Sequence, residues 1–161
     1  AATAFGCGAM YYKKGDIDKS IEYFDNAIEL EQDPIQKSEY CYTAAQVLFS
    51  DKKLSKAKQY ARKAIENNAE YGEPYILIAQ MYATSPNWSD EAALNKCTYF
   101  AVIDKLQKAK SVDPNLAEKA NELISTYSRY TPKDEDLFFI GIKKGDAVTI
   151  GGWIGETTTV R

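Results

Sequence analysis

Histidine is absent from the sequence, which has 161 residues and a formal net charge of −3. Without an imidazole, catalysis by a histidine base, Ser-His-Asp triads and histidine-ligated metal sites are all excluded. The 20 basic residues nearly balance the 23 acidic ones, which argues against nucleic acid as a partner. Composition therefore favours a binding or structural protein over an enzyme, with no metal ion and no cofactor.

Cysteine is scarce, and its spacing suits neither a disulfide framework nor zinc. Cys7, Cys41 and Cys97 are odd in number and form no CxxC pair. Each lies in an apolar helical stretch, so we expect free thiols that pack as small hydrophobic residues. No apolar run approaches the length of a membrane span, and no signal peptide opens the chain. The first five residues read as a helix already under way, which predicts a fragment of a longer protein.

Proline recurs at a fixed interval. Pro34, Pro74 and Pro114 are 40 residues apart, and Asp33 and Asp113 precede two of them as N-caps. Apolar residues between these prolines step by three and four, the spacing of one helix face. The pattern predicts seven helices paired as antiparallel hairpins: 5–14, 16 to about 30, 34–50, 54–68, 74–83, 90–112 and 115 to about 130.

Small residues occur at fixed places in three successive units. Their first helices read Ala4-x2-Cys7-Gly8-x2-Tyr11, Cys41-x2-Ala44-Ala45-x2-Leu48 and Tyr75-x2-Ile78-Ala79-x2-Tyr82, and their second helices carry Ala27, Ala64 and Ala109. This pattern resembles the tetratricopeptide repeat (TPR) family. The resemblance covers residues 1–130. It implies an all-α, right-handed superhelix of about three hairpins, residues 1–33, 34–72 and 73–113, closed by a capping helix at 115–130.

The third unit departs from the family pattern. Ala64 and Ala109 are 45 residues apart, whereas a TPR unit has about 34 residues. An insertion must therefore fall within 83–96, as a longer loop or a longer second helix. Acidic residues after Ser89 favour the long helix, 90–112, with Trp88 packed back on its first turn.

Residues 131–161 change character to glycine and β-branched residues, which predicts a small β-hairpin from 147–150 and 157–160. An isolated hairpin is marginally stable, so we expect Phe138, Phe139, Ile150 and Trp153 to dock it on the helices. The tail, with its Gly-Gly-Trp-Ile sequence at 151–154, is similar to that of TPR proteins common in Bacteroidetes. That resemblance implies a bacterial periplasmic or cell-envelope location, with the cytoplasm as the open alternative.

Two charged clusters have structural explanations that need no bound partner. The acidic run 134–136 suits a helix start, where carboxylates complement the helix dipole, better than it suits catalysis. The basic residues Lys52, Lys53, Lys56, Lys58, Arg62 and Lys63 allow an anionic partner, but a solvated convex helix face is the favoured interpretation.

The family resemblance places a concave groove on the first helix of each unit. The groove positions hold aromatic and amide side chains, which suit a peptide or protein partner; we take as candidate contacts Phe5, Tyr12, Tyr42, Gln46, Phe49, Ile76 and Gln80. The positions that clamp a peptide carboxylate in some TPR proteins hold no basic residue here: Phe5, Ala9, Thr43, Glu73 and Leu77. The predicted function is a protein-interaction scaffold. The alternatives are a groove filled by another segment of the protein, or a self-association module that forms a homodimer.

Overall fold

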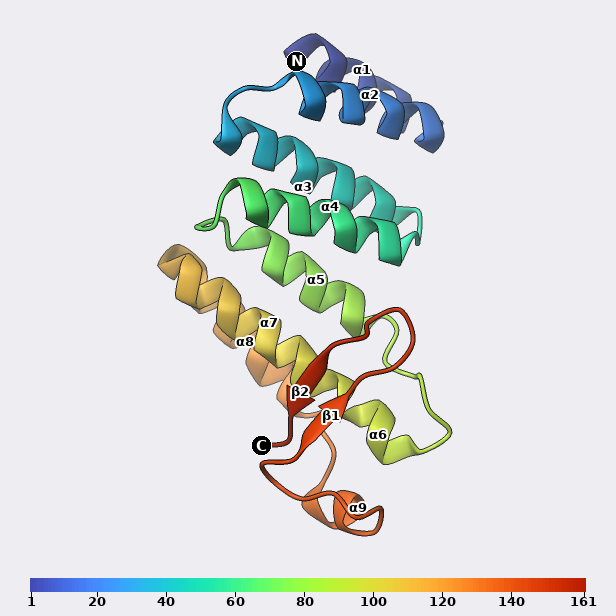
Figure 1. The fold of residues 1–161 in the computed structure, drawn as a ribbon, viewed down its shortest axis with the longest axis vertical. Coiled ribbons are helices and arrows are strands. Elements are labelled where there is room, and N and C mark those ends of the chain that lie inside the picture. The colour runs from blue at the N-terminus through green and yellow to red at the C-terminus, as the bar shows by residue number, and fades with distance from the viewer. The chain divides into compact units, whose positions relative to one another are not determined.

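A computed structural model describes residues 1–161, which form two compact units, residues 1–74 and 75–161 (Figure 1). Most residues lie in helices, and the only sheet has two strands. The C-terminal tail belongs to the same compact unit as residues 75–130. No helix is long and apolar enough to cross a bilayer.

The N-terminal unit contains two helical hairpins and the start of α5. They are formed by α1 (Ala2–Lys13) with α2 (Ile17–Leu30) and by α3 (Pro34–Ser50) with α4 (Leu54–Asn67), while α2 packs on α3. Asp16 caps α2 by accepting a hydrogen bond from the Lys19 N–H at 3.2 Å. Asp33 caps α3 in the same way, from the Ile35 N–H at 3.0 Å. These caps confirm the helix starts that the sequence predicts.

Close approach of the helices explains the small residues of each hairpin. A β-carbon added to Gly8 would lie 2.6 Å from the Phe24 ring, and Ala27 and Ala64 are fully buried. The Ser20 hydroxyl also donates to the Gly8 carbonyl at 2.8 Å, which adds a polar contact between α1 and α2. Residues of this size at these places support the predicted register.

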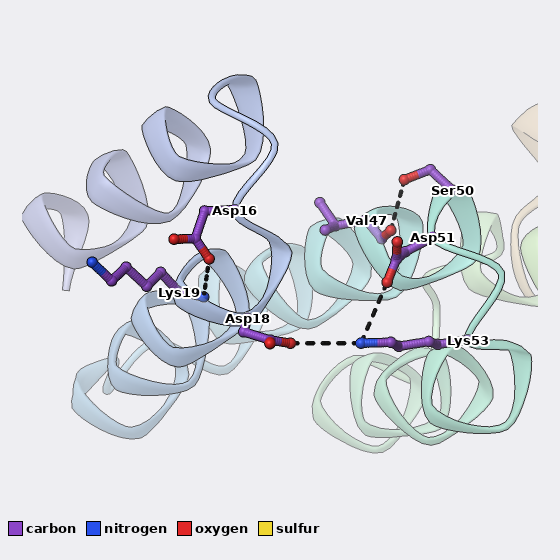
Figure 2. A network of polar contacts seen from close by, with 7 residues as sticks. All are labelled: Asp16, Asp18, Lys19, Val47, Ser50, Asp51 and Lys53. Carbon is purple, nitrogen blue, oxygen red and sulfur yellow. Dashed lines mark hydrogen bonds and ion pairs between the residues drawn. The ribbon is translucent and has the colours of Figure 1, made fainter.

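Ion pairs join the turns at one end of the two hairpins (Figure 2). The Lys53 ammonium lies 3.6 Å from Asp18 on α2 and 3.3 Å from Asp51 in the α3–α4 turn. The hydrogen bond to Asp51 and the charges of both carboxylates raise the Lys53 pKa. One member of the predicted basic cluster is therefore paired within the fold. Lys58 is another exception to the solvated face, since only 7% of it is exposed.

The C-terminal unit contains the rest of α5 (Glu73–Ala83) and the helices that follow it. These are α6 (Ala92–Lys96), α7 (Thr98–Val112), a 3₁₀ turn η1 (Pro114–Leu116), α8 (Ala117–Ser128) and α9 (Asp134–Phe138). Residues 84–91 are a loop, so the expected helix from residue 90 to 112 begins late. It is also interrupted at Cys97, whose N–H donates to the Leu94 carbonyl, one residue short of the α-helical partner.

Side-chain hydrogen bonds explain why the insertion is a loop. The Asn95 carboxamide oxygen accepts from the Trp88 and Ser89 N–H groups at 2.9 and 2.8 Å, and its nitrogen donates to the Ser89 carbonyl. The Thr98 hydroxyl donates to the Pro86 carbonyl at 2.9 Å. These side chains satisfy backbone groups that a longer helix would otherwise pair.

The tail forms the predicted hairpin. Strands β1 (Ala147–Thr149) and β2 (Thr157–Thr159) are antiparallel, with Val148 opposite Thr158. The hairpin docks on α7, where the Thr158 hydroxyl donates to Asp104 at 2.6 Å and Lys105 pairs with Glu156 at 2.8 Å. Arg161 also pairs with Asp104. The fold thus supplies polar as well as apolar anchors for the tail.

Two of the four expected apolar anchors are correct. Ile150 is fully buried, and the Trp153 ring meets Tyr82 edge-on with centroids 5.4 Å apart. Phe138 and Phe139 are 78% and 86% exposed, because Leu137 is the residue of the short helix α9 that points into the core.

Trp88 also contacts the tail. Its ring lies against the Gly151 backbone, where an added β-carbon would come within 2.7 Å of it.

Candidate peptide-binding face

Helices α1 and α3 lie side by side and run in the same direction. The Phe5 and Tyr40 rings stack with centroids 4.6 Å apart near the N-terminal ends of the two helices. Near the C-terminal ends, the Tyr12 hydroxyl donates to the Ser50 hydroxyl at 3.3 Å. Two contacts at opposite ends fix the direction of one helix relative to the other. The first helices of two successive units therefore share one face.

Aromatic and amide groups are accessible on this face. Tyr12 is 41% exposed, Gln46 is exposed and Phe49 is half-buried. Gln46 and Phe49 are three residues apart on α3, so their side chains lie on the same side of that helix. An apolar ring beside an amide with both a donor and an acceptor suits a peptide, which offers side chains and backbone groups together.

Tyr42 forms the inner part of the face. Its half-buried ring meets Tyr71 edge-on at a centroid distance of 5.4 Å. Burial, followed by the charge of Glu73, raises the pKa of Tyr42 to about 12. The phenol is therefore protonated at neutral pH and can donate a hydrogen bond.

The remaining candidates are not equally accessible. Phe5 is half-buried because it also packs on Phe24, with ring centroids 5.4 Å apart. Ile76 is 1% exposed and belongs to the core, so we leave it out of the proposed contact surface. Gln80 is half-buried on α5 in the C-terminal unit. Of the accessible candidates on the first two units, Phe5 and Tyr12 lie on α1, and Tyr42, Gln46 and Phe49 lie on α3.

Ile35 is an accessible residue of this face that was absent from the candidates. It is 57% exposed on the first turn of α3. It precedes Tyr42 by seven residues, so both lie on the same side of the helix. That spacing is visible in the sequence, but exposure of an isoleucine is not.

Comparisons with known proteins concern the repeat pattern and the fold. A tetratricopeptide-repeat family profile matches residues 8–34 and 38–71. These two segments correspond to the first two of the three predicted repeat units. Stress-induced-phosphoprotein 1 of Caenorhabditis elegans is 36% identical over 80 residues, which are 50% of this chain and 24% of that protein. The chain thus spans about a quarter of that relative's length.

Solved TPR structures have a similar fold at low sequence identity. The TPR2B domain in the pHsp70 complex of yeast Sti1 has a TM-score of 0.61 and 17% identity, over 80% of this chain and 95% of that one. The first TPR of Spaghetti (RPAP3), bound to the HSP90 peptide SRMEEVD, has a TM-score of 0.57 and 16% identity over 80% and 92%. TTC0263 of Thermus thermophilus has a TM-score of 0.57 and 17% identity over 85% and 71%. These likenesses confirm the TPR-type helical fold, and the two-stranded sheet of the tail confirms the predicted appendage.

Proposed function

We propose that this protein is a protein-interaction scaffold that binds a peptide or protein segment on the face formed by α1 and α3. The observation that carries the proposal is the row of accessible aromatic and amide groups on two parallel first helices, with Tyr12, Gln46 and Phe49 as its outer part. Aromatic rings give a binding surface large contact area at low cost in conformational entropy. The Sti1 and RPAP3 domains with this fold were solved with pHsp70 and with an HSP90 peptide, which supports a peptide-binding role.

The ligand of this face is neutral or basic and carries apolar side chains. Exposed Glu39 lies on α3, and half-buried Glu73 lies close enough to Tyr42 to raise its pKa. Thr43, one turn after Glu39 on α3, carries no positive charge. An acidic peptide would meet repulsion here, whereas apolar and cationic side chains would pack on the rings.

The HSP90 peptide SRMEEVD distinguishes this proposal from a carboxylate clamp. We expect weak binding of this peptide, with a dissociation constant above about 1 mM by isothermal titration calorimetry at moderate ionic strength. A micromolar constant that is lost on substitution of Tyr42 would contradict the proposed ligand chemistry.

Selection from a displayed library of random peptides tests the proposed face itself. Peptides enriched on the wild-type protein should bind a Tyr12→Ala/Phe49→Ala variant at least about tenfold more weakly, because both rings leave the contact surface. Leu30→Ala is the matched control, since Leu30 is 61% exposed at the end of α2. Equal binding by all three proteins would rule out this face.

Self-association is the second candidate, and the exposed aromatic pair of α9 favours it. Phe138 and Phe139 border an open cleft of about 600 Å³ that also contains Leu137 and Ile142. The same cleft carries acidic residues, Asp134 and Glu135, and basic residues, Lys143 and Lys144. A face with both signs of charge is self-complementary across a two-fold axis.

Sedimentation velocity over a range of protein concentrations tests this second candidate. A concentration-dependent dimer that disappears in Phe138→Ser/Phe139→Ser would support it, and both residues are exposed enough to be replaced without disturbing the core. A monomer at every concentration would exclude it.

A further inference from the structure

A second cleft lies entirely within the C-terminal unit, away from α1 and α3. Its volume is about 370 Å³, which falls in the range of small-molecule sites. The loop before α6 supplies Asn87, α6 supplies Lys96, and α7 supplies Tyr99. The segment after α8 supplies Arg129, Tyr130 and Lys133, among others.

The charges of this cleft are all of one sign. Lys96, Arg129 and Lys133 line it, and no acidic residue does. None of the three cations is within 4.0 Å of a carboxylate oxygen, unlike Lys53, Lys105, Lys144 and Arg161. Glu91 and Asp136 line a neighbouring depression that shares Lys96 but not the other two cations. Three cations without counter-charges make the cleft an attractive place for an anion.

Aromatic rings form one wall of the cleft. The Tyr99 ring stacks on the Tyr127 ring, with centroids 6.1 Å apart. It also contacts the Tyr130 ring, with centroids 5.3 Å apart and 32° between the planes of Tyr99 and Tyr130. Tyr130 is 52% exposed, so one side of its ring is accessible to a ligand. Burial raises the pKa of Tyr99, which keeps its hydroxyl protonated and able to donate. The wall thus offers apolar area next to the cationic groups.

Hydrogen bonds hold the loop that contributes Asn87 to the cleft. Asn95 uses its carboxamide oxygen and nitrogen in hydrogen bonds to the backbone of Trp88 and Ser89, and these bonds fix the loop that carries Asn87. Thr98, next to Tyr99, holds Pro86 of the same loop at 2.9 Å. A loop that is fixed in advance lowers the ordering cost of ligand binding.

From this arrangement we infer that the cleft binds a phosphate monoester, with the phosphate between Arg129, Lys133 and Lys96 and the organic part against Tyr130. The guanidinium of Arg129 can donate two parallel hydrogen bonds to phosphate oxygens. A phosphate monoester carries close to two negative charges at neutral pH, which matches three cations better than the single charge of a carboxylate. The tyrosine ring provides the contact for the ester group.

Phenyl phosphate is the probe for this cleft, followed by amide NMR and calorimetry on the full chain at low ionic strength. We expect saturable binding, with amide shifts concentrated at residues 86–99 and 129–133. Arg129→Gln should weaken binding about tenfold or more. Lys108→Gln, an equal charge change at an exposed residue of α7 that does not line the cleft, should change it less than about twofold.

Two further ligands separate the phosphate from the organic group. Inorganic phosphate should bind more weakly than phenyl phosphate, and Tyr130→Ala should remove that difference while leaving inorganic phosphate binding unchanged. Benzoate, with one negative charge, should bind more weakly than phenyl phosphate. Non-saturable binding up to roughly 10 mM, an equal loss in Arg129→Gln and Lys108→Gln, or equal binding of benzoate and phenyl phosphate would overturn the inference.

Discussion

The small residues of each hairpin have little room for a larger side chain. Gly8 faces the Phe24 ring, and Ala64 is fully buried where the Ser38 hydroxyl donates to its carbonyl at 2.7 Å. Even a single added atom would disturb the packing at these places, because protein interiors are packed as densely as organic crystals. Enlarging such a residue tests the register of the repeats directly.

Ala64→Leu is expected to lower the free energy of unfolding by about 1–3 kcal/mol, since the added atoms overpack the α3–α4 hairpin. The control is Lys56→Leu, at an exposed position of the same helix, which should change it by less than about 0.5 kcal/mol. Urea melts followed by circular dichroism measure both. Equal losses would show that Ala64 does not lie at a packing position.

Thiol accessibility provides a second test at this scale. Cys41 and Cys97 are fully buried, and burial raises the pKa of each thiol to about 11, whereas Cys7 is half-buried. The thiolate is the reactive species, so Cys7 should react first. We expect a chromogenic aromatic disulfide to detect one fast-reacting thiol in the native protein and three after denaturation. Three fast thiols in the native state would contradict the described core.

Elements of the chain differ in how they are stabilised. The N-terminal hairpins depend on helix packing, and the ion pair between Lys53 and Asp18 joins the α3–α4 turn to α2 (Figure 2). The β-hairpin of the tail has only two strands and depends on its contact with α7. Asp104 on that helix contacts both Thr158 and Arg161. The tail is therefore an integral part of the C-terminal unit.

Ile150→Ala is expected to lower the free energy of unfolding by about 2–5 kcal/mol, because the fully buried side chain joins the tail to the core. Thr159→Ala, at an exposed position of β2, should cost less than about 1 kcal/mol. Thermal unfolding of the two variants gives the comparison. Equal stability of Ile150→Ala and the wild type would mean that the tail is a loosely attached appendage.

At the scale of the whole molecule, stability should fall in the alkaline range. The thiol pKa values of Cys41 and Cys97 rise from 9.0 when exposed to about 11 in the fold, so the folded state keeps protons that the unfolded chain loses. The contribution is fully present below pH 9 and disappears as the pH rises towards 11. Urea melts between these values should show a falling free energy of unfolding. The fall should be shallower in Cys41→Ala/Cys97→Ala; the same slope in both proteins would contradict this origin.

Local sequence signals predicted much of the fold, because caps and small residues act over a few residues. Asp33 and Asp113 cap helices as predicted, and the spacing of Ala27 and Ala64 gave the repeat register. Side-chain orientation in the tail depends on tertiary packing, so Phe138 was expected inside and lies outside.

Tertiary packing also explains the differences between prediction and structure at the candidate sites. Lys58 is buried because α4 has a broad buried side that also includes Ala57 and Ala61. Ile76 occupies a groove position of the repeat pattern, yet only 1% of it is exposed. The aromatic positions of α1 and α3 followed from repeat spacing, but their exposure required the three-dimensional structure.

The most direct test of the proposed function is amide NMR mapping of a selected peptide on the wild-type protein. We predict the largest shifts at residues 5–12 on α1 and 35–49 on α3, with small shifts on α2 and α4. Shifts concentrated on α2 and α4, or on the tail at residues 134–161, with α1 and α3 unchanged, would contradict it.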